Sequence, residues 1–354
     1  MKQKNRKNYL GIDVSKPWFD VSLLPIIDHV KQSLVTERFD NTVAGMTAFK
    51  NWLKLNGVTL DENSLLVIEN TGVYHRQLWN FCSKHNLPLH IGNAAHIKWS
   101  LGITRGKSDV IDSVRLCQYC CKQSDELKAT PALNPVFMKL KDLMSSRSRL
   151  VTQLHSTKNY LKELQCSNDK LLLATLEKAH KAAIEGIKKS ILQIEELITQ
   201  IIEQDANIYK NYLLIKSVPG IGHLTAIYII CCTNNFASKV SGKQLASYAG
   251  VVPFEHSSGV SIRGKKRVHK MANKELKKML HLCALTAIKY YPEFKDYFNR
   301  KKAEGKNGML VLNAIRNKLV LRVVAVVNKQ QRYVDNIGIA ASGAGLLWKK
   351  QIKF

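Results

Sequence analysis

The sequence predicts an α/β domain at the N-terminus, followed by a long helical insertion and a mostly helical C-terminal domain. Within 1–128, short apolar runs typical of strands alternate with segments whose apolar residues recur at helical spacing. Between 136 and 202, helical spacing continues for longer than one ordinary helix. The chain has 354 residues, 45% of them hydrophobic, which is enough for two or three domains with their own cores.

The elements of the N-terminal part follow a definite order. Strands are expected at 9–13, 19–24, 34–39, 65–69 and 87–91, and helices at 43–55, 73–85 and 108–123. Thr42 is placed to cap the first of these helices. Three strands, a helix, a strand, a helix and a strand in this order suit a ribonuclease-H-like sheet.

The middle of the chain has the pattern of a helical hairpin. A polar, proline-containing stretch at 124–135 predicts a linker. Two long patterns at 136–164 and 171–202, separated by a break at 166–169, predict antiparallel helices. They form either a coiled coil or part of a plain helical bundle.

The C-terminal part is also predicted to be helical. Further helices are expected at 243–248, 273–290 and 310–328. We therefore expect an α/β domain at 1–128, a helical hairpin at 129–205, a basic C-terminal domain at 206–335 and a tail at 336–354.

The charge balance favours a polyanionic partner. The chain holds 54 Lys and Arg against 27 Asp and Glu, a net charge of +27. Residues 1–205 carry a net charge of +7, and residues 206–354 carry +20. Because each neutralised phosphate releases condensed counterions, such a field favours nucleic acid. A basic soluble surface or a ribosome-associated protein are the alternatives.

The sequence gives no sign of a membrane span or a disulfide framework. It has no run of about 18 to 20 apolar residues and no apolar segment typical of a signal peptide at the N-terminus, so we expect a cytoplasmic protein that does not enter a membrane. Eight cysteines suit reduced thiols. The cluster Cys117, Cys120 and Cys121 resembles half a zinc site, but helical spacing favours partly buried thiols. Cys231 and Cys232 lie in an apolar run and are expected in the core.

Four acids have the placement of a metal site. Asp13 and Glu69 each end an apolar run predicted to be a strand, and Asp109 and Asp112 lie one helical turn apart. Carboxylates converging in this way can bind Mg²⁺, which prefers oxygen ligands and can promote phosphodiester chemistry. Taken singly, each acid is better explained as a turn residue or a helix-terminal acid, but the order and placement of the four acids together favour a metal site.

Two further stretches have the composition of phosphate-binding segments. Val-Pro-Gly-Ile-Gly at 218–222 resembles the turn of a helix–hairpin–helix module, in which Gly220 and Gly222 would let backbone N–H groups approach a phosphate. An ordinary turn between helices is the alternative.

The second stretch, 256–267, has the composition of a polar, basic loop. Its cations could neutralise a phosphate attacked by a nearby serine, or could simply bind the DNA backbone. From the residues alone, phosphate binding is the better interpretation. The cations are Arg263, Lys265, Lys266 and Arg267, and the serines are Ser257, Ser258 and Ser261.

Several strings in the chain resemble one family of proteins. They are Tyr-Leu-Gly-Ile-Asp-Val-Ser-Lys at 9–16, Ile-Glu-Asn-Thr-Gly-Val-Tyr at 68–74, Thr-Arg-Gly-Lys-Ser-Asp-Val-Ile-Asp at 104–112, Ser-Val-Pro-Gly-Ile-Gly at 217–222, Leu-Ala-Ser-Tyr-Ala-Gly-Val-Val-Pro at 245–253 and Ser-Ser-Gly-Val-Ser-Ile-Arg-Gly at 257–264. Together they are similar to the DEDD transposases of insertion-sequence family 110, including its 1111 subgroup.

This resemblance, which covers about 9–328, implies a function and its residues. It implies a RuvC-like N-terminal domain that binds Mg²⁺ or Mn²⁺ through Asp13, Glu69, Asp109 and Asp112, a coiled-coil insertion, and a C-terminal domain in which Ser258 is the nucleophile. It also implies donor and target DNA, a structured non-coding bridge RNA, homodimers that assemble into a homotetramer, and a bacterial or archaeal, nucleoid-associated location.

Three alternatives share part of this pattern. A junction resolvase or structure-specific nuclease would use the acids with activated water and would tolerate loss of Ser258. A sugar kinase or actin-like ATPase would share Gly-Ile-Asp-Val-Ser at 11–15, but the later phosphate motif is not evident and the basic C-terminal half does not suit it. A non-catalytic nucleic-acid-binding relative would not need all four acids.

Overall fold

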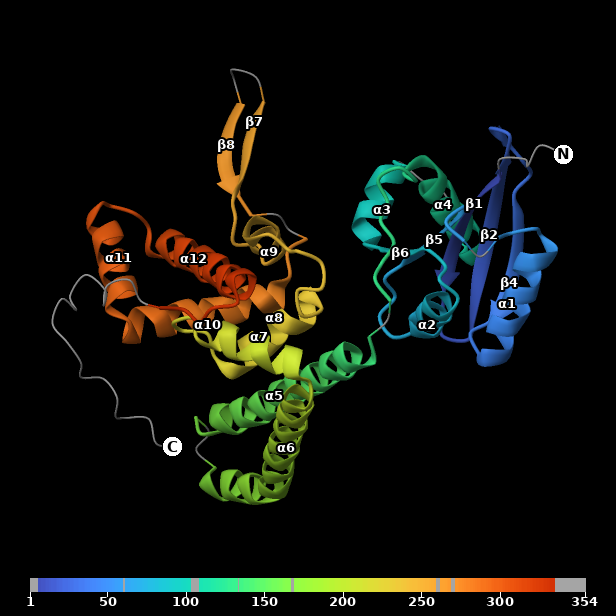
Figure 1. The fold of residues 1–354 in the computed structure, drawn as a ribbon. Coiled ribbons are helices and arrows are strands. Elements are labelled where there is room, and N and C mark those ends of the chain that lie inside the picture. The colour runs from blue at the N-terminus through green and yellow to red at the C-terminus, as the bar shows by residue number, and fades with distance from the viewer. Residues whose placement is uncertain are drawn as a thin grey trace. The chain divides into compact units, whose positions relative to one another are not determined.

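The chain folds into two compact units, 1–134 and 135–354, each of which is described by itself (Figure 1). The computed structural model describes residues 6–59, 61–102, 108–132, 134–166, 169–258, 262–268 and 271–334. Within 255–267 the description is of the backbone alone. The predicted hairpin at 129–205 and the predicted domain at 206–335 lie mainly in one unit, and their finer division stays a prediction.

The first unit is built on a six-stranded mixed sheet. Its order is β3-β2-β1-β5-β6, with β4 also paired to β2. The strands are β1 (Arg6–Val14), β2 (Trp18–Ile27), β3 (Val30–Lys31), β4 (Val35–Asp40), β5 (Ser64–Glu69) and β6 (Leu89–Gly92). The first four pair in an antiparallel manner, whereas β1, β5 and β6 run parallel.

Helices cover both faces of this sheet. The helices are α1 (Val43–Leu55), α2 (Arg76–Lys84), α3 (Ala94–Leu101) and α4 (Asp109–Lys122). Leu10 and Leu66 pack with residues of α1 and α2, while their neighbours Tyr9 and Val67 pack with α3 and α4. Because successive side chains of a strand point to opposite faces, strands buried on both faces appear in the sequence as continuous apolar runs.

Helix α4 lies directly against β1 because Gly11 has no side chain. A Cβ at Gly11 would lie 1.9 Å from the backbone nitrogen of Cys117 and 2.3 Å from the carbonyl oxygen of Ser113. The buried hydroxyls of Ser22 and Ser113 are 2.7 Å apart, and the Cys117 thiol donates to the Tyr9 carbonyl at 3.2 Å. The thiols of α4 therefore pack on the sheet, and burial raises the pKa of Cys117 to about 12.

The second unit begins with the long hairpin of α5 (Pro135–Leu164) and α6 (Lys170–Gln204). Its base, with Leu140 and Ile198, is part of the core of the unit. Further along, Arg147 forms an ion pair with Glu195 across the two helices, with 2.6 Å between Nε and Oε1. The predicted helical hairpin is confirmed.

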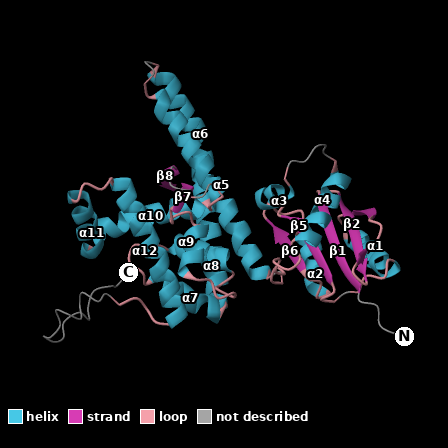
Figure 2. Cartoon of the chain, turned by 90° about the horizontal axis from the view of Figure 1, so that it is seen from above, coloured by secondary structure: helices cyan, strands magenta, loops and turns pink. Residues whose placement is uncertain are grey.

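The rest of the unit is a helical core that carries a two-stranded sheet (Figure 2). Its helices are α7 (Ala206–Lys216), α8 (His223–Thr233), α9 (Gly242–Tyr248), α10 (Lys274–Tyr290), α11 (Pro292–Ala303) and α12 (Gly308–Lys329). The strands β7 (Phe254–Ser258) and β8 (Ile262–Arg267) pair in an antiparallel manner and project beside α9 (Figure 1). We call β7 and β8 the serine hairpin.

Several sequence-based expectations need correction. The serine hairpin was expected to be a loop, because its polar residues lack the apolar alternation of a half-buried strand. Helices α3, α7, α8 and α11 and the short strand β3 were not among the predicted elements. The helix over 43–55 is confirmed, with the Thr42 hydroxyl accepting from the Gly45 N–H. In the described part of the chain, every helix is too short or too polar to cross a bilayer.

Candidate active site

Two of the predicted acids lie at the same edge of the sheet. Asp13 belongs to the end of β1, and Glu69 is the last residue of β5. The two strands are parallel neighbours, with Ile12 paired to Ile68, so the next residue of each strand lies at the adjoining carboxyl ends. This is the arrangement that the sequence predicted for these two acids.

A third acid reaches the same place from α4. Ser108 caps this helix by accepting from the Ile111 N–H at 3.3 Å, and the helix begins at Asp109. Asp112 lines a pocket of about 600 Å³ together with Asp13 and Glu69. We call this the acidic pocket. The close approach of α4 to β1 therefore joins carboxylates that are 99 positions apart in the chain.

The acidic pocket changes the protonation of Asp13. Burial is the main cause that raises the pKa of Asp13 to about 6. The neighbouring charges of Asp112, Asp109 and Glu69 follow in that order, and Asp20 adds a smaller contribution. Several carboxylates that oppose one another's ionisation are a common feature of sites that bind a cation or transfer protons.

The fourth acid, Asp109, turns toward a neighbouring basic and aromatic pair. Its Oδ2 accepts from Nε1 of Trp18 at 3.3 Å and lies 3.6 Å from Nη2 of Arg38. The Arg38 guanidinium stacks on the Trp18 ring and forms two 3.0 Å hydrogen bonds with Asp20. Asp109 is thus close enough to influence Asp13 but does not line the acidic pocket.

Two cations of the acidic pocket were not predicted from the sequence. Lys98 lies on α3, which was itself not predicted, and Arg115 follows Asp112 by one helical turn with 3.0 Å between Nη1 and Oδ1. Asn93 was the available signal for α3, because its side chain accepts from the N–H groups of the first turn.

The acids provide a donor set that suits a hard divalent cation. Carboxylate oxygens are the ligands that Mg²⁺ prefers, and a cation would offset both the burial and the neighbouring negative charges that raise the pKa of Asp13. Among the described residues, however, no three Asp, Glu, His or Cys side chains stand close enough to enclose an ion as they are. The chemistry of the pocket fits a metal, and binding would draw the carboxylates closer together.

The predicted serines belong to the second unit. Ser257 pairs with Arg263 and Ser258 with Ile262, so both serines lie near the turn of the serine hairpin. Ser261 lies outside the described residues. The backbones of Lys265, Lys266 and Arg267 continue along β8. The roles assigned to these residues stay predictions.

The two predicted phosphate-binding glycines have different surroundings. Gly220 has a φ of +79°, and a Cβ there would lie 2.6 Å from the Cys283 carbonyl of α10. Its lack of a side chain is therefore explained by packing. Gly222 precedes α8 as its N-cap, and a Cβ there would meet open space. A phosphate-binding role for either glycine stays a prediction.

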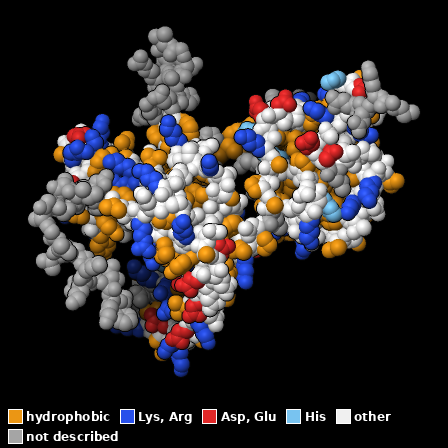
Figure 3. Space-filling model, in the orientation of Figure 1, with side chains coloured by type: hydrophobic (Ala, Val, Ile, Leu, Met, Phe, Trp, Pro, Cys, Tyr) orange, Lys and Arg blue, Asp and Glu red, His pale blue; other side chains and the backbone are white. Residues whose placement is uncertain are grey.

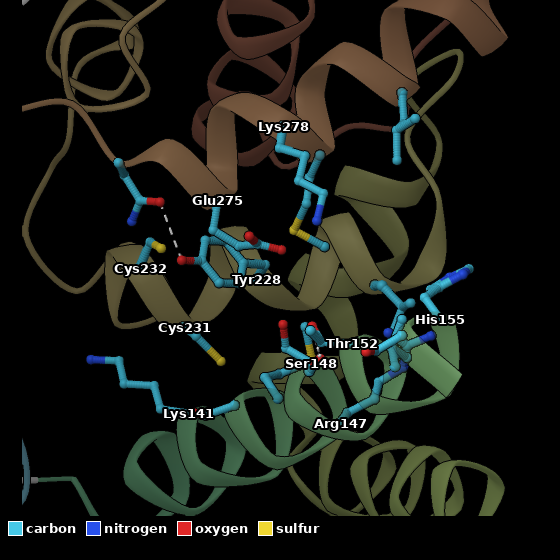
Figure 4. A pocket seen from close by; sticks show the side chains of 18 of the residues that line it. Lys141, Arg147, Ser148, Thr152, His155, Tyr228, Cys231, Cys232, Glu275 and Lys278 are labelled. Carbon is cyan, nitrogen blue, oxygen red and sulfur yellow. Dashed lines mark hydrogen bonds between the residues drawn. The ribbon is translucent and has the colours of Figure 1, made fainter. Parts of the chain in front are cut away.

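A larger cavity of about 1130 Å³ lies in the second unit between α5, α8 and α10 (Figure 4). The hydroxyl of Tyr228 donates to Asn273 at 3.2 Å, and Asn273 donates to the Tyr248 hydroxyl at 2.8 Å. Lys141 and Lys278 also line it, and Glu275 is its one acid among the described residues. This cavity lacks the converging carboxylates of the acidic pocket, which remains the candidate active site.

Comparison with known proteins relates the chain to transposases. Residues 10–165 match a family model for transposases with the DEDD motif of insertion element IS110, and residues 212–299 match a model described as the transposase IS116/IS110/IS902 family. The first match contains the four acids, and the second contains Ser258.

Individual relatives agree with the family matches. The chain is 28% identical over 338 residues to the pilin gene-inverting proteins of Moraxella bovis and Moraxella lacunata, which covers 94% of this chain and 99% of each relative. It is 33% identical over 93 residues to an uncharacterized 43.6 kDa protein of insertion element IS110 from Streptomyces coelicolor, which covers 26% of this chain and 23% of that protein.

Proposed function

This chain belongs to the IS110 family of DEDD transposases and is a DNA transposase or recombinase, and we propose that its acidic pocket and its serine hairpin share the chemistry of strand cleavage and exchange. The observation that carries this proposal is the meeting of Asp13, Glu69 and Asp112 at one pocket from three separate elements. Carboxylates so gathered destabilise one another unless a cation or a proton joins them.

We infer a RuvC-like, ribonuclease-H-like architecture for the first unit. The support is the sheet: antiparallel β1, β2 and β4 adjoin parallel β1, β5 and β6, and helices cover both faces. This order puts the ends of β1 and β5 beside the start of α4. The three acids of the acidic pocket therefore come from β1, β5 and α4 alone.

The residues that would hold a divalent metal are Asp13, Glu69 and Asp112, with Asp109 able to join by leaving Arg38. A bound Mg²⁺ or Mn²⁺ would supply charge stabilisation for the oxygens of a reacting phosphodiester. Arg115 and Lys98 line the same pocket and would orient the phosphate through its non-bridging oxygens.

The serine hairpin would supply the nucleophile. In this proposal the Ser258 hydroxyl oxygen forms a bond to phosphorus, one P–O bond to a deoxyribose breaks, and the departing oxygen takes up a proton. Strand exchange is the reverse reaction with a different DNA end, so the bond energy is conserved in the serine ester. Strand β8 follows Ser258 in the chain. Its basic residues, Arg263, Lys265, Lys266 and Arg267, would bind the DNA backbone.

The proposed partners are donor and target DNA, a structured bridge RNA and further copies of this chain. The net charge of +20 over 206–354 supports binding of nucleic acid. We also propose that this chain forms homodimers that assemble into a homotetramer, which is what the resemblance to the family implies. Two relatives are named as pilin gene-inverting proteins, and we propose inversion of a DNA segment as one outcome of the exchange.

A covalent protein–DNA adduct is the decisive test. We expect a cleavage reaction with supercoiled donor DNA and Mg²⁺, stopped by denaturant, to leave a nucleotide on Ser258, because a phosphoserine ester survives unfolding. The variant S258A should lose the adduct and recombination together while retaining nucleic-acid binding. S257A and S261A control for the register of the motif.

The outcomes separate this proposal from its main alternative. A nucleotide mapped to Ser257 or Ser261 would move the nucleophile to that residue. Efficient cleavage by S258A without an adduct would instead indicate water attack, as in a junction resolvase. In both cases D13N should abolish cleavage, because both mechanisms need the acidic pocket.

A further inference from the structure

The helix α12 carries a buried arginine that has no carboxylate partner in the described part of the chain. Arg316 is 6% exposed. Its Nη2 donates to Nδ1 of His281 at 2.7 Å and lies 3.3 Å from Sδ of Met309. Its Nε is enclosed and makes no hydrogen bond, and no acid among the described residues forms an ion pair with it.

Two further basic side chains belong to the neighbouring helix α10: His281, which contacts the guanidinium, and Lys277, which precedes His281 by one turn. Both are half-buried. Burial and then the charge of Arg316 lower the pKa of Lys277 and of His281. Lys277 and His281 are therefore both affected by the positive charge of Arg316, and no acid among the described residues offsets that charge. We call Arg316, Lys277 and His281 the basic triad.

An arginine elsewhere on the same helix shows the contrast. Arg322 forms two hydrogen bonds with the carboxylate of Glu293, and its guanidinium lies 4.6 Å from the ring centre of Phe294. Taking a charge out of water is costly unless a counter-charge repays it. The ion pair with Glu293 offsets the cost of burying Arg322, whereas Arg316 lacks such a partner within the described chain.

The basic triad lies at the root of the serine hairpin. Asn313, one turn before Arg316, donates to the Val251 carbonyl at 2.8 Å, just ahead of β7. A Cβ on Gly250 would lie 3.8 Å from Cδ of Lys277, so Lys277 passes alongside the same segment. Met309, which covers Nη2 of Arg316, is itself 58% exposed and can move aside.

We propose that Arg316, Lys277 and His281 bind one phosphodiester group of a nucleic-acid backbone at the root of the serine hairpin. A phosphodiester shares one negative charge between its two non-bridging oxygens, which can accept from the guanidinium and from the Lys277 ammonium. The Nε2 of His281 donates to the phosphate, because Nδ1 accepts from Arg316. A nucleic-acid strand bound at this phosphate is held in a fixed position relative to β7. This inference rests on the proposed function, since it requires that the chain handle nucleic acid.

The test compares R316M with R322M in the full-length protein. Affinity for a duplex DNA and for an RNA hairpin is measured between about 50 and 200 mM salt. R316M should weaken binding roughly tenfold, the effect of losing a hydrogen bond to a charged group. It should also reduce the log–log salt slope by about 0.9 on duplex DNA. R322M should leave the slope unchanged.

The melting temperature of the free protein provides the second readout. R316M should melt at the same or a higher temperature than the unaltered chain, because it removes an uncompensated buried charge. R322M should have a lower melting temperature, because it leaves the carboxylate of Glu293 without its ion-pair partner. A lower melting temperature for R316M, with affinity and slope unchanged, would make Arg316 a purely structural residue and overturn the proposal.

Two milder variants guard against misfolding of R316M. K277M and H281Q should each weaken binding in the same direction, K277M with a smaller salt slope. If only DNA binding or only RNA binding falls, the phosphate belongs to that nucleic acid. If the unaltered chain binds both nucleic acids and all three variants bind equally well, the phosphate site is excluded while the proposed function stands. If the unaltered chain binds neither, the proposed function itself fails.

Discussion

Asp13 is the buried carboxyl of the acidic pocket, and its protonation couples stability to pH. Its folded-state pKa of about 6 exceeds the ordinary value of 3.8, so between these values the folded protein binds more protons than the unfolded chain. The stability of the metal-free protein should therefore fall as pH rises from about 4 to 6. Above pH 6 the full penalty of an ionised Asp13 is present.

We predict that D13N stabilises the metal-free protein at pH 7.5 by about 1–3 kcal/mol and has little effect at pH 4. Added Mg²⁺ should raise the melting temperature of the unaltered chain and leave that of D13N nearly unchanged, because ligand binding stabilises the folded state only where the ligand binds. Thermal melts with and without Mg²⁺ measure both effects. The exposed Asp125 provides a control, D125N, that should follow the unaltered chain. A D13N protein less stable than its parent at pH 7.5 without metal would contradict the assignment.

At the level of secondary-structure elements, the acidic pocket depends on how closely α4 approaches β1. Gly11 permits this approach, and the Ser22–Ser113 hydrogen bond maintains it. Asp112 would move away from Asp13 if α4 were displaced by the width of a methyl group. The position of one carboxylate is therefore set by a glycine on a different element.

We predict that G11A destabilises the first unit by more than about 3 kcal/mol, because its Cβ would lie 1.9 Å from a backbone nitrogen that cannot swing aside. Any folded fraction should lose the Mg²⁺ response. The matched control is G186A in the middle of α6, where a Cβ meets nothing within 4 Å. It should stabilise the hairpin by roughly 0.5–1 kcal/mol. Denaturant unfolding of both variants measures the difference, and equal stability for G11A and the unaltered chain would show that α4 can shift freely.

At the scale of the whole molecule, positive charge is concentrated in the second half of the chain. On the face shown in Figure 3, Lys and Arg side chains gather over α10 to α12. The first 205 residues have 21 acids to offset their 28 cations, whereas the remainder has 6 acids for 26 cations. Electrostatic attraction of nucleic acid should therefore depend mainly on the C-terminal part.

We predict that replacing Lys265, Lys266 and Arg267 of β8 together by Gln lowers DNA affinity about equally for all sequences and reduces the salt slope by up to about 2.7 on duplex DNA, because three phosphate contacts are lost. Replacing the exposed Lys31, Lys54 and Lys84 of the first unit removes the same charge and should leave most of the slope intact. Titrations at several salt concentrations provide the comparison. Equal losses for the two triple variants would mean that net charge alone, without a preferred surface, governs binding.

The sequence by itself determined the features that depend on near neighbours in the chain. The cap at Thr42, the start of α4 at Ser108, the ends of β1 and β5 at their acids, and the two long helices all follow from local hydrogen bonding and from the spacing of apolar residues. The concentration of positive charge in 206–354 was also evident from the sequence, because net charge follows from the numbers of acidic and basic residues. These signals predicted which acids could meet.

Only the tertiary structure decided how closely those acids meet and which charges lack partners. The approach of α4 to β1, the turning of Asp109 toward Arg38, and the burial of Arg316 among basic groups all depend on contacts between residues far apart in the chain. The serine hairpin was missed for the same reason. Its strands are held by pairing across the turn, and pairing of polar strands leaves no apolar period in the sequence.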